Sequence, residues 1–478
     1  MKRVLPLSLL DEEIPRCKKP KTEPQIIVDE EEEESTVAEV VDEEQLSTSQ
    51  TKALDLVKRG SNVFITGSAG TGKSFLLKKI MTFLDEANKP FELTASTGVA
   101  AWHIGGSTLH SFAGIGLGDE KVEVALEKLK KRKDKVADWR SIHALIVDEI
   151  SMIQVKYLEK LNCIAKALRN SPRAFGGIQL ILIGDYFQCP SVEKKKDVKH
   201  RFPFQAPLWK ELNIQSIALK ENFRQANDNS FFQLLERVKV SRTTRDDENV
   251  LKKRLILSHN DVDESALIRL CSRRDTAEVV NKTELEKIDS PSVFFKGELI
   301  NYDLHGHVIP ASSSTEDDKK DRYPVDMNIE LKIGAEVLLC CNMDKENGLF
   351  NGCRGRVVAF RRDIDDPLDT RSYPVVHFEH GFRTIVKPNR WETKKKKRLT
   401  SAFTQIPLLL RYAITIHRAQ GLTLSKVLIT MDFFEYGQGY VALSRVRALD
   451  DLFLKDVNMK RIMVSEDVID FYTKHGLI

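Results

Sequence analysis

The sequence predicts an α/β protein built on parallel, doubly wound sheets. Short apolar runs, each typical of a buried parallel strand, alternate with helical patterns. The first run leads into GSAGTGKS at Gly67–Ser74, which matches the phosphate-loop pattern G-x-x-x-x-G-K-[ST]. Another run ends in two consecutive carboxylates, Asp148-Glu149. The predicted strands of the first sheet are Val63–Ile65, Phe91–Ala95, Ala144–Val147 and Ile178–Ile183.

The phosphate loop predicts a nucleoside-triphosphate site. Its glycines allow the backbone to turn successive N–H groups onto a phosphate chain, and the following helix adds the positive end of its dipole. Lys73 is expected to reach the β- and γ-phosphates, and the Ser74 hydroxyl to ligate Mg²⁺. The residues expected to bind the nucleotide here are Gly67, Ser68, Ala69, Gly70, Thr71, Gly72, Lys73 and Ser74.

Polar residues after later strands predict the rest of the site. Asp148 is expected to hold Mg²⁺ through water, and Glu149 to polarise the attacking water. Gln188 follows the strand that closes in Gly184-Asp185 and is a candidate γ-phosphate sensor. Because ligands bind at the carboxyl ends of parallel strands, these side chains and Lys73 are expected at one rim of the sheet.

Charge divides the chain into an acidic tail and a basic body. Residues 1–44 hold 6 Lys/Arg and 14 Asp/Glu, whereas the remainder holds 68 Lys/Arg and 56 Asp/Glu. The tail is therefore predicted to be disordered, and the body to bind a polyanion, most plausibly nucleic acid. Arg16–Lys21 fits either a nuclear-import signal or solvated charge in a loose tail, and Lys128–Lys135 either an exposed helix or a nucleic-acid contact.

Composition narrows the cellular setting. The seven cysteines form no C-x-x-C pair, so neither a zinc site nor a disulfide framework is indicated, and a reducing intracellular compartment is expected. No run approaches the roughly 18 apolar residues of a membrane span, so no membrane partner is expected.

The second half of the chain predicts a β-rich module followed by a second sheet. From Leu331 to Trp391 short strands alternate with glycine turns, a pattern typical of a small β-barrel. A buried strand at Val427–Met431 then precedes a late arginine, Arg445. This arrangement suggests a second α/β sheet that contributes Arg445 to a shared site.

Nine segments in series resemble the petite-integration-frequency (PIF-one) family of ATP-dependent DNA helicases, a RecD-like branch of superfamily 1B. Between residues 46 and 455 they read GSAGTGKS, TASTGVAA, GGSTLHSFAGIG, IVDEISM, AFGGIQLILIGDYFQCPSV, NFRQ, NGCRGRVVAF, AITIHRAQGLTL and YVALSRVRAL. One departure is Cys189-Pro190-Ser191, where the family commonly has Leu-Pro-Pro, and it leaves the strand contact at that point in doubt.

The resemblance implies two RecA-like motor domains, each interrupted by an insertion, with ATP between them. The implied segments are a disordered acidic tail at 1–44, a first motor domain at 45–215 with a wedge at about 115–140, the first part of the second motor domain at 216–344, an SH3-like barrel at 345–405, and the remainder of the second motor domain at 406–478.

The resemblance also assigns roles to residues outside the phosphate loop. Arg224 and Arg445 match two arginines that reach the γ-phosphate, Gln50 matches an adenine-reading glutamine, and Gln420-Gly421 belong to a motif that links the ATP state to strand grip. The residues that fall in motifs lining the DNA channel are Thr97, His110, Phe112, Phe187 and His417.

The predicted function is that of a DNA helicase that uses ATP and Mg²⁺ to move 5′→3′ on single-stranded DNA and to separate duplexes, in replication, repair, recombination or telomere maintenance. The expected partners are single-stranded and forked DNA, the expected state is a monomer, and the expected location is the nucleus, with the cytoplasm as the alternative. Two further hypotheses are a translocase that displaces proteins and an RNA helicase.

Overall fold

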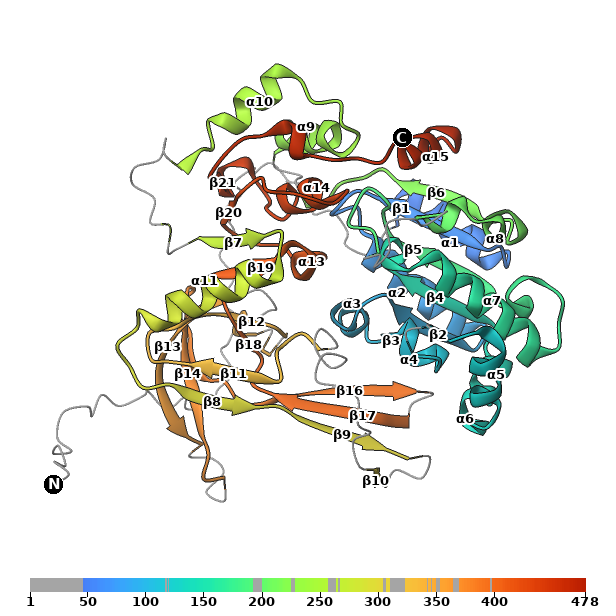
Figure 1. Ribbon diagram of the computed structural model, residues 1–478, viewed down its shortest axis with the longest axis horizontal. Helices are drawn as coiled ribbons and strands as arrows, with labels where there is room; N and C mark the ends of the chain where they lie inside the picture. Colours follow the sequence, from blue (N-terminus) through green and yellow to red (C-terminus); the bar gives the residue numbers. More distant parts are fainter. Residues whose placement is uncertain are drawn as a thin grey trace, which may run out of the picture. The chain divides into compact units, whose positions relative to one another are not determined.

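Parallel strand pairing organises the chain into two α/β sheets, and antiparallel strands form a third region (Figure 1). The computed structural model describes residues 46–116, 118, 120–191, 200–224, 228–256, 264, 267–303, 307–309, 323–341, 343–344, 346–349, 353–363, 369–395 and 398–478. The acidic tail, with its predicted disorder and nuclear-import signal, lies outside these residues.

The first sheet has six parallel strands in the order β3-β2-β4-β5-β1-β6. All five residues of β1 and β5 are buried, as expected for central strands covered on both faces. The predicted strands are therefore confirmed, with ends that differ by one or two residues. The strands are β1 (Val63–Gly67), β2 (Phe91–Ala95), β3 (Ser107–Thr108), β4 (Ala144–Asp148), β5 (Gln179–Ile183) and β6 (Gln215–Leu219).

Helices connect these strands and bury one apolar side each. The helix α1 begins after Ser47, whose side chain forms a reciprocal capping box with Gln50. The helix α7 buries Leu158, Leu161 and Ile164, and positive φ angles at residues 175–177 then turn the chain into β5. These helices are α1 (Thr48–Lys58), α2 (Lys73–Glu86), α3 (Gly98–His103), α4 (Leu109–Ala113), α5 (Val122–Lys130), α6 (Lys133–Ser141), α7 (Val155–Arg169) and α8 (Pro207–Glu211).

The basic run Lys128–Lys135 covers the end of α5, a short turn and the start of α6. Lys135 is not a solvated charge: its side chain is buried, and its ammonium donates to the carbonyl oxygens of Ser111 and Phe112, the latter at 3.1 Å. One cation of the run therefore ties α6 to α4 and is unavailable to a phosphate.

The second sheet has four parallel strands in the order β19-β7-β20-β21, so its neighbours in space come from distant parts of the sequence. Its strands and helices are α9 (Asn229–Lys239), α10 (Arg245–Lys252), β7 (Ile268–Cys271), α11 (Arg274–Glu286), β19 (Ala413–Thr415), α13 (Ile416–Ala419), β20 (Val427–Ile429), α14 (Gln438–Leu443) and β21 (Leu452–Leu454).

A β-rich region with its own core interrupts the second sheet between α11 and β19. It contains the five-stranded sheet β15-β14-β13-β12-β18, the four-stranded sheet β10-β9-β17-β16 and the pair β11-β8. Its strands are β8 (Val293–Lys296), β9 (Glu298–Tyr302), β10 (Val308–Ile309), β11 (Asn328–Leu331), β12 (Glu336–Leu339), β13 (Arg354–Arg362), β14 (Ser372–Phe378), β15 (Arg383–Ile385), β16 (Asn389–Lys395), β17 (Arg398–Gln405) and β18 (Leu408–Leu410). The region begins earlier than the predicted boundary at 345, because β9 pairs with β17 and β12 pairs with β13 and β18.

The last helix, α15 (Glu466–Lys474), packs on the first sheet, although it follows the second in sequence (Figure 1). This differs from the predicted grouping of 406–478 with the second sheet. The buried Tyr472 hydroxyl lies 2.7 Å from the Thr66 hydroxyl, accepts from the Tyr186 N–H at 3.1 Å and donates to the Asp185 carboxylate at 3.2 Å. The physical reason is that α15 supplies a hydrogen-bonding partner for buried polar groups where β1 and β5 end.

We expect Tyr472→Phe to lower the free energy of unfolding by about 1–3 kcal/mol, because the change removes one hydroxyl and leaves buried donors without their partner. The measurement is urea denaturation of the parent and the variant. Tyr302→Phe is the matched control: the Tyr302 hydroxyl accepts from Arg390 in an exposed setting, and its loss should change stability by less than about 0.5 kcal/mol. Equal stability of the parent and Tyr472→Phe would contradict the assigned network.

Candidate nucleotide and nucleic-acid site

The phosphate loop connects β1 to α2 as predicted, and its glycines are required by close contacts. Gly70 and Gly72 have φ angles of +89° and +77°, a region that favours glycine. A Cβ on Gly70 would lie 2.3 Å from the Cβ of Arg224, and one on Gly72 would lie 2.6 Å from the Gln50 amide nitrogen. The loop is therefore enclosed by two of the predicted site residues.

Lys73 is the first residue of α2, and its ammonium points back along the loop. It donates to the carbonyl oxygens of Gly67 at 2.8 Å and Ser68 at 3.0 Å. Burial lowers the pKa of Lys73, although Asp185, Glu149 and other carboxylates oppose this effect. A triphosphate would supply further negative charge beside an ammonium that is poorly solvated.

Asp148 ends β4, and Glu149 follows it in a left-handed conformation. Burial and the neighbouring Glu149 charge raise the pKa of Asp148 to about 7. Glu149 has φ +53° and ψ +46°, which is uncommon for a residue other than glycine, asparagine or aspartate. The Glu149 carboxylate accepts from the Gln420 side-chain amide at 2.9 Å, so a residue beyond the second sheet's β19 contacts the residue predicted to polarise the attacking water.

The residues predicted to hold Mg²⁺ lie on one cavity. Ser74, Asp148 and Glu149 all line a cavity of about 1300 Å³ that continues between the two sheets and the β-rich region. No group of three or more His, Cys, Asp or Glu suited to a metal occurs among the described residues. One hydroxyl and one carboxylate nevertheless fit Mg²⁺, because this ion keeps several waters and completes its shell with substrate phosphates.

Gln188 and Asp185 lie in the turn after β5. Gln188 is buried, and its backbone N–H donates to the Asp185 carbonyl oxygen at 3.0 Å. Gly437, just before α14, approaches so closely that a Cβ there would lie 2.4 Å from the Gln188 carbonyl oxygen. The structure thus places Gln188 on the first sheet's rim, directly against the second sheet's helix α14.

The two predicted arginines come from different segments and both contact Ser444, and Arg224 also packs on the phosphate loop. Arg224 donates to the Ser444 carbonyl oxygen at 3.3 Å, and its Cβ packs on Gly70. Arg445 is 1% exposed. Its guanidinium donates to the carbonyl oxygens of Val441, Ala419 and Leu422 and to the Ser444 hydroxyl.

Arg445 is therefore not a surface arginine that pairs with the nearby carboxylates of Asp450 or Asp451. Asp450 instead pairs with Arg254 at 3.2 Å. Burial, together with the nearby Arg224 charge, lowers the pKa of Arg445 to about 9, so the side chain remains charged at neutral pH.

An open apolar surface lies beside Gln50 and Gly72. Phe223 is 59% exposed, and its ring is 3.3 Å from the position of a Cβ on Gly72. The Phe223 N–H donates to the Gly70 carbonyl oxygen at 2.9 Å, which holds the ring next to the loop. An exposed ring beside a carboxamide suits the stacking and edge recognition of a nucleobase.

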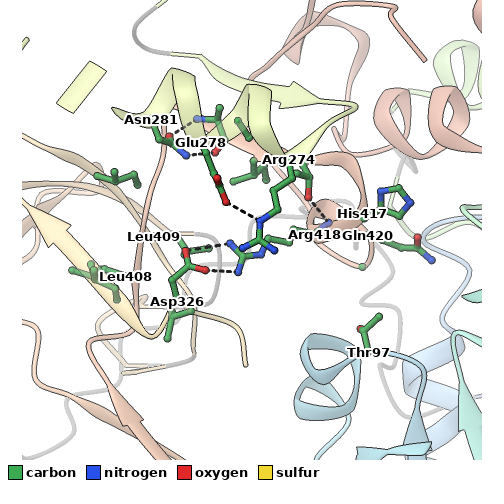
Figure 2. Close-up of a pocket in the computed structure, with 18 of the residues that line it drawn as sticks. Thr97, Arg274, Glu278, Asn281, Asp326, Leu408, Leu409, His417, Arg418 and Gln420 are labelled. Carbon is green, nitrogen blue, oxygen red and sulfur yellow. Dashed lines mark hydrogen bonds and ion pairs between the residues drawn. The ribbon is translucent and has the colours of Figure 1, made fainter. Parts of the chain in front are cut away.

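The five residues predicted to contact DNA differ in how exposed the structure leaves them. Thr97 and His417 line the cavity from opposite sides, as Figure 2 shows, together with Gln420 and Gly421. His110 is half-buried and packs its ring on Tyr157 with centroids 4.3 Å apart.

The structure buries two of the side chains predicted to line the DNA channel, Phe112 and Phe187. Phe112 is 1% exposed and packs on Trp139, with ring centroids 4.7 Å apart. Phe187 is 3% exposed and packs on Tyr472 at 4.6 Å. Neither ring presents a face to a base, because each fills the core behind the loop that its motif forms.

Two residues of the site were not predicted individually from the sequence. Asp185 is buried and is the largest electrostatic support of the Lys73 charge. The sequence did indicate Asp185, because this carboxylate follows a predicted buried strand and is therefore expected at the same rim as Asp148. Phe223 also had a signal, because an aromatic residue directly precedes the predicted arginine Arg224.

Comparisons with known proteins agree with this geometry. The family model described as PIF1-like helicase matches residues 45–248, and the model of the DNA helicase Pif1 2B domain matches residues 322–360. The crystal structure of Pif1 helicase from Candida albicans is 35% identical, with a TM-score of 0.71, and the match covers 90% of this chain and 99% of that one. The chain belongs to the PIF1-like helicase family.

Other members of the PIF1-like family match over similar lengths. ATP-dependent DNA helicase PIF1 of Danio rerio is 40% identical over 90% of this chain, which spans 64% of that relative's length. Bacteroides sp Pif1 in complex with ADP-AlF4 is 27% identical with a TM-score of 0.74, covering 91% of this chain and 98% of that one. Bacteroides Pif1 bound to single-stranded DNA has 28% identity and a TM-score of 0.59, with 90% and 97% covered.

The two parallel sheets are accordingly RecA-like motor folds. Within the described part of the chain, no helix is long and apolar enough to cross a membrane.

The raised pKa of Asp148 predicts a pH dependence of stability. Because the folded pKa of about 7 exceeds the ordinary value of 3.8, protonation stabilises the fold, and this contribution is lost as the pH rises toward 7. Without nucleotide or metal, we expect the stability of Asp148→Asn relative to the parent to increase by about 2–3 kcal/mol between pH 5 and pH 8.

The measurement is chemical denaturation of both proteins at pH 5, 6, 7 and 8. Asp85→Asn, at an exposed position of α2, controls for a general loss of acidic charge. A stability difference between Asp148→Asn and the parent that stays constant over this range would refute the assigned pKa.

Proposed function

We propose that this chain is an ATP-dependent DNA helicase that translocates 5′→3′ along single-stranded DNA and separates duplex DNA, as in replication, repair or recombination. The observation that carries the proposal is the 2.9 Å hydrogen bond between Gln420, from the second motor, and Glu149, from the first. A site that draws its groups from two motor folds can change when the folds move, and movement is what translocation requires.

Each residue of the nucleotide site has a chemical role in this proposal. Lys73 and the loop N–H groups bind the phosphates, and Glu149 orients the attacking water. Ser74 and Asp148 would hold Mg²⁺, which would neutralise charge that develops on the phosphates. Gln188 lies where a γ-phosphate would be sensed.

Arg224 and Arg445 are proposed to stabilise the negative charge of the transferring phosphoryl group. Arg224 packs on Gly70 of the loop, Arg445 lies near Arg224 and Glu149, and the hydrogen bonds of Arg445 to α13 and α14 give its guanidinium a set orientation. A preoriented cation in a poorly solvated site stabilises developing charge better than a mobile one, because little reorganisation accompanies the reaction.

The adenine is proposed to lie between Gln50 and Phe223. A carboxamide can pair with both a donor and an acceptor on the adenine edge, and the exposed ring offers a stacking face. Thr97 and His417 are proposed to contact single-stranded DNA in the cavity, with Gln420-Gly421 linking it to Glu149. Bacteroides Pif1, which binds single-stranded DNA, supports this choice of partner. Forked DNA is the proposed duplex substrate.

The proposed domains keep the predicted roles. Residues 45–215 form the first motor with α5 and α6 as its wedge, and the β-rich region contains the SH3-like barrel within 345–405 as an insertion in the second motor. A single copy is proposed to suffice for hydrolysis, because the two motor folds of one chain meet at the Gln420–Glu149 hydrogen bond. The proposed location is the nucleus.

The test of the proposed function is the behaviour of Lys73→Ala. We expect the parent to show ATP hydrolysis stimulated by single-stranded DNA and to separate a forked duplex. Lys73→Ala should lose both activities yet bind single-stranded DNA within about threefold of the parent, because DNA affinity is distributed over many backbone contacts. Lys52→Ala, exposed on α1, is the control and should match the parent. Near-parental hydrolysis by Lys73→Ala would place the nucleotide elsewhere.

Arg224→Ala tests the composite site. Removal of an arginine that stabilises the transition state typically costs about 10³–10⁵ in rate, so we expect at least a 10³-fold loss of the DNA-stimulated rate at saturating ATP. Binding of ADP, which lacks the γ-phosphate, should change by less than about threefold. Arg242→Ala, an exposed arginine just after α9, should keep the parental rate. A comparable rate for the two variants would remove Arg224 from the site.

A further inference from the structure

Ser68 is a residue of the phosphate loop that contacts the second motor through its side chain. Its carbonyl oxygen accepts from the Lys73 ammonium at 3.0 Å and from the Thr71 hydroxyl at 2.9 Å, both within the loop and α2. Its hydroxyl donates to the Glu236 carboxylate at 2.5 Å and accepts from the Lys239 ammonium at 2.9 Å. Both of these partners lie on α9, one turn apart.

A second contact fixes the neighbouring residue. The Ala69 N–H donates to the Tyr440 hydroxyl on α14 at 3.1 Å. Ser68 and Ala69 are 6% and 8% exposed, so helices of the second motor cover this arm of the loop. In addition to their predicted place in the nucleotide-binding loop, these two residues therefore link the loop to helices of the second motor.

Lys239 is an unusual residue for a helix face that packs on a core. It is 4% exposed, and its ammonium also lies 3.7 Å from Glu236 and 5.1 Å from the centre of the Phe187 ring. Burial acts to lower the pKa of Lys239, but Asp185, Tyr440 and Glu236 outweigh it, so the pKa lies above its ordinary value and the group is charged at neutral pH.

From these contacts we infer that Lys239 is a positioning residue for ATP binding, acting through Ser68. Ser68 holds both Lys73 and Thr71 by its carbonyl oxygen, so a shift of Ser68 would displace the phosphate-binding ammonium. By holding the Ser68 hydroxyl from α9, Lys239 makes the shape of the phosphate loop depend on the docking of the second motor. This inference rests on the proposed ATP site. It adds the hydrogen bond between Lys239 and Ser68, which is in place before a nucleotide binds.

A merely structural role for Lys239 predicts a different result. Removing one partner of a buried ion pair is destabilising, but Glu236 is 34% exposed and keeps the hydrogen bond from the Ser68 hydroxyl, so we expect Lys239→Met to lower stability without unfolding the protein. If Lys239 only filled space, Lys239→Met would leave nucleotide affinity unchanged. If it positions the loop, ATP binding weakens while the groups that react with bound ATP remain.

The experiment compares Lys239→Met, Ser68→Ala and the double variant with the parent protein. We expect the dissociation constant for ATP, measured by calorimetry with Mg²⁺ present, and the KM for ATP to rise about tenfold in each single variant, which is about 1.4 kcal/mol. The kcat with saturating ATP and single-stranded DNA should stay within about threefold, and so should the affinity for single-stranded DNA.

The double variant identifies the path of the effect. Since Lys239 acts through the Ser68 hydroxyl, the double variant should bind ATP within about twofold of the weaker single variant. A loss near 100-fold, the product of the two, would overturn the inference by showing independent effects. Unchanged affinity in folded Lys239→Met or folded Ser68→Ala would also overturn it. So would a fall of kcat with an unchanged KM.

The controls separate this inference from the proposed function. Lys252→Met removes a half-exposed lysine of α10 that pairs with Glu248, and it should keep the parental ATP affinity. Circular dichroism and the unfolding midpoint establish that each variant is folded, and Ser68→Ala, the smallest change, carries the test if Lys239→Met does not fold. A parent that fails to bind ATP refutes the proposed site. If the parent and the folded variants bind ATP equally tightly, only the role of Lys239 is refuted.

Discussion

The parallel register of the central strands is the constraint on which the nucleotide site depends. In the first sheet β4 pairs with β5, and β5 with β1, all in the same direction. Their carboxyl ends consequently lie side by side, where each strand gives way to a polar turn. Gly67, Asp148 and Asp185 are far apart in sequence, but this register brings them to one rim. An antiparallel neighbour would have sent one of these turns to the opposite edge.

The second constraint is electrostatic, because this rim concentrates charge in a poorly solvated volume. The basic groups Lys73, Lys239 and Arg445 face carboxylates such as Asp185 and Glu149. In low dielectric, each buried charge is tolerable only when opposite charges or hydrogen bonds surround it. Both motors contribute charged groups to this rim. The placement of one motor relative to the other therefore affects the protonation of these groups and their capacity to bind a ligand. A bound triphosphate would join the same balance with its own negative charge.

Local motifs were predictable because their physics is local. The phosphate loop requires glycines at positions of positive φ and a helix that begins at Lys73, and all of these lie within eight residues. The face of α7 followed from apolar spacing, since a helix repeats every 3.6 residues. By contrast, Phe112 belongs to a polar, glycine-rich motif that could have faced solvent. Its burial is decided by Trp139 and by Lys135, which ties α6 to α4.

By itself the sequence determined the α/β class, the triphosphate loop, the two carboxylates at the end of β4 and the family to which the chain belongs. Each of these is specified by residue types at short, fixed spacing. Only the tertiary structure decided that α15 returns to the first motor, that Ser68 is bound from α9 and that Arg445 is buried among backbone carbonyls. The residues joined by the Tyr472, Ser68 and Arg445–Ala419 hydrogen bonds lie 406, 171 and 26 positions apart in the chain. Spacing along the chain does not indicate which distant surfaces will pack together and exclude water.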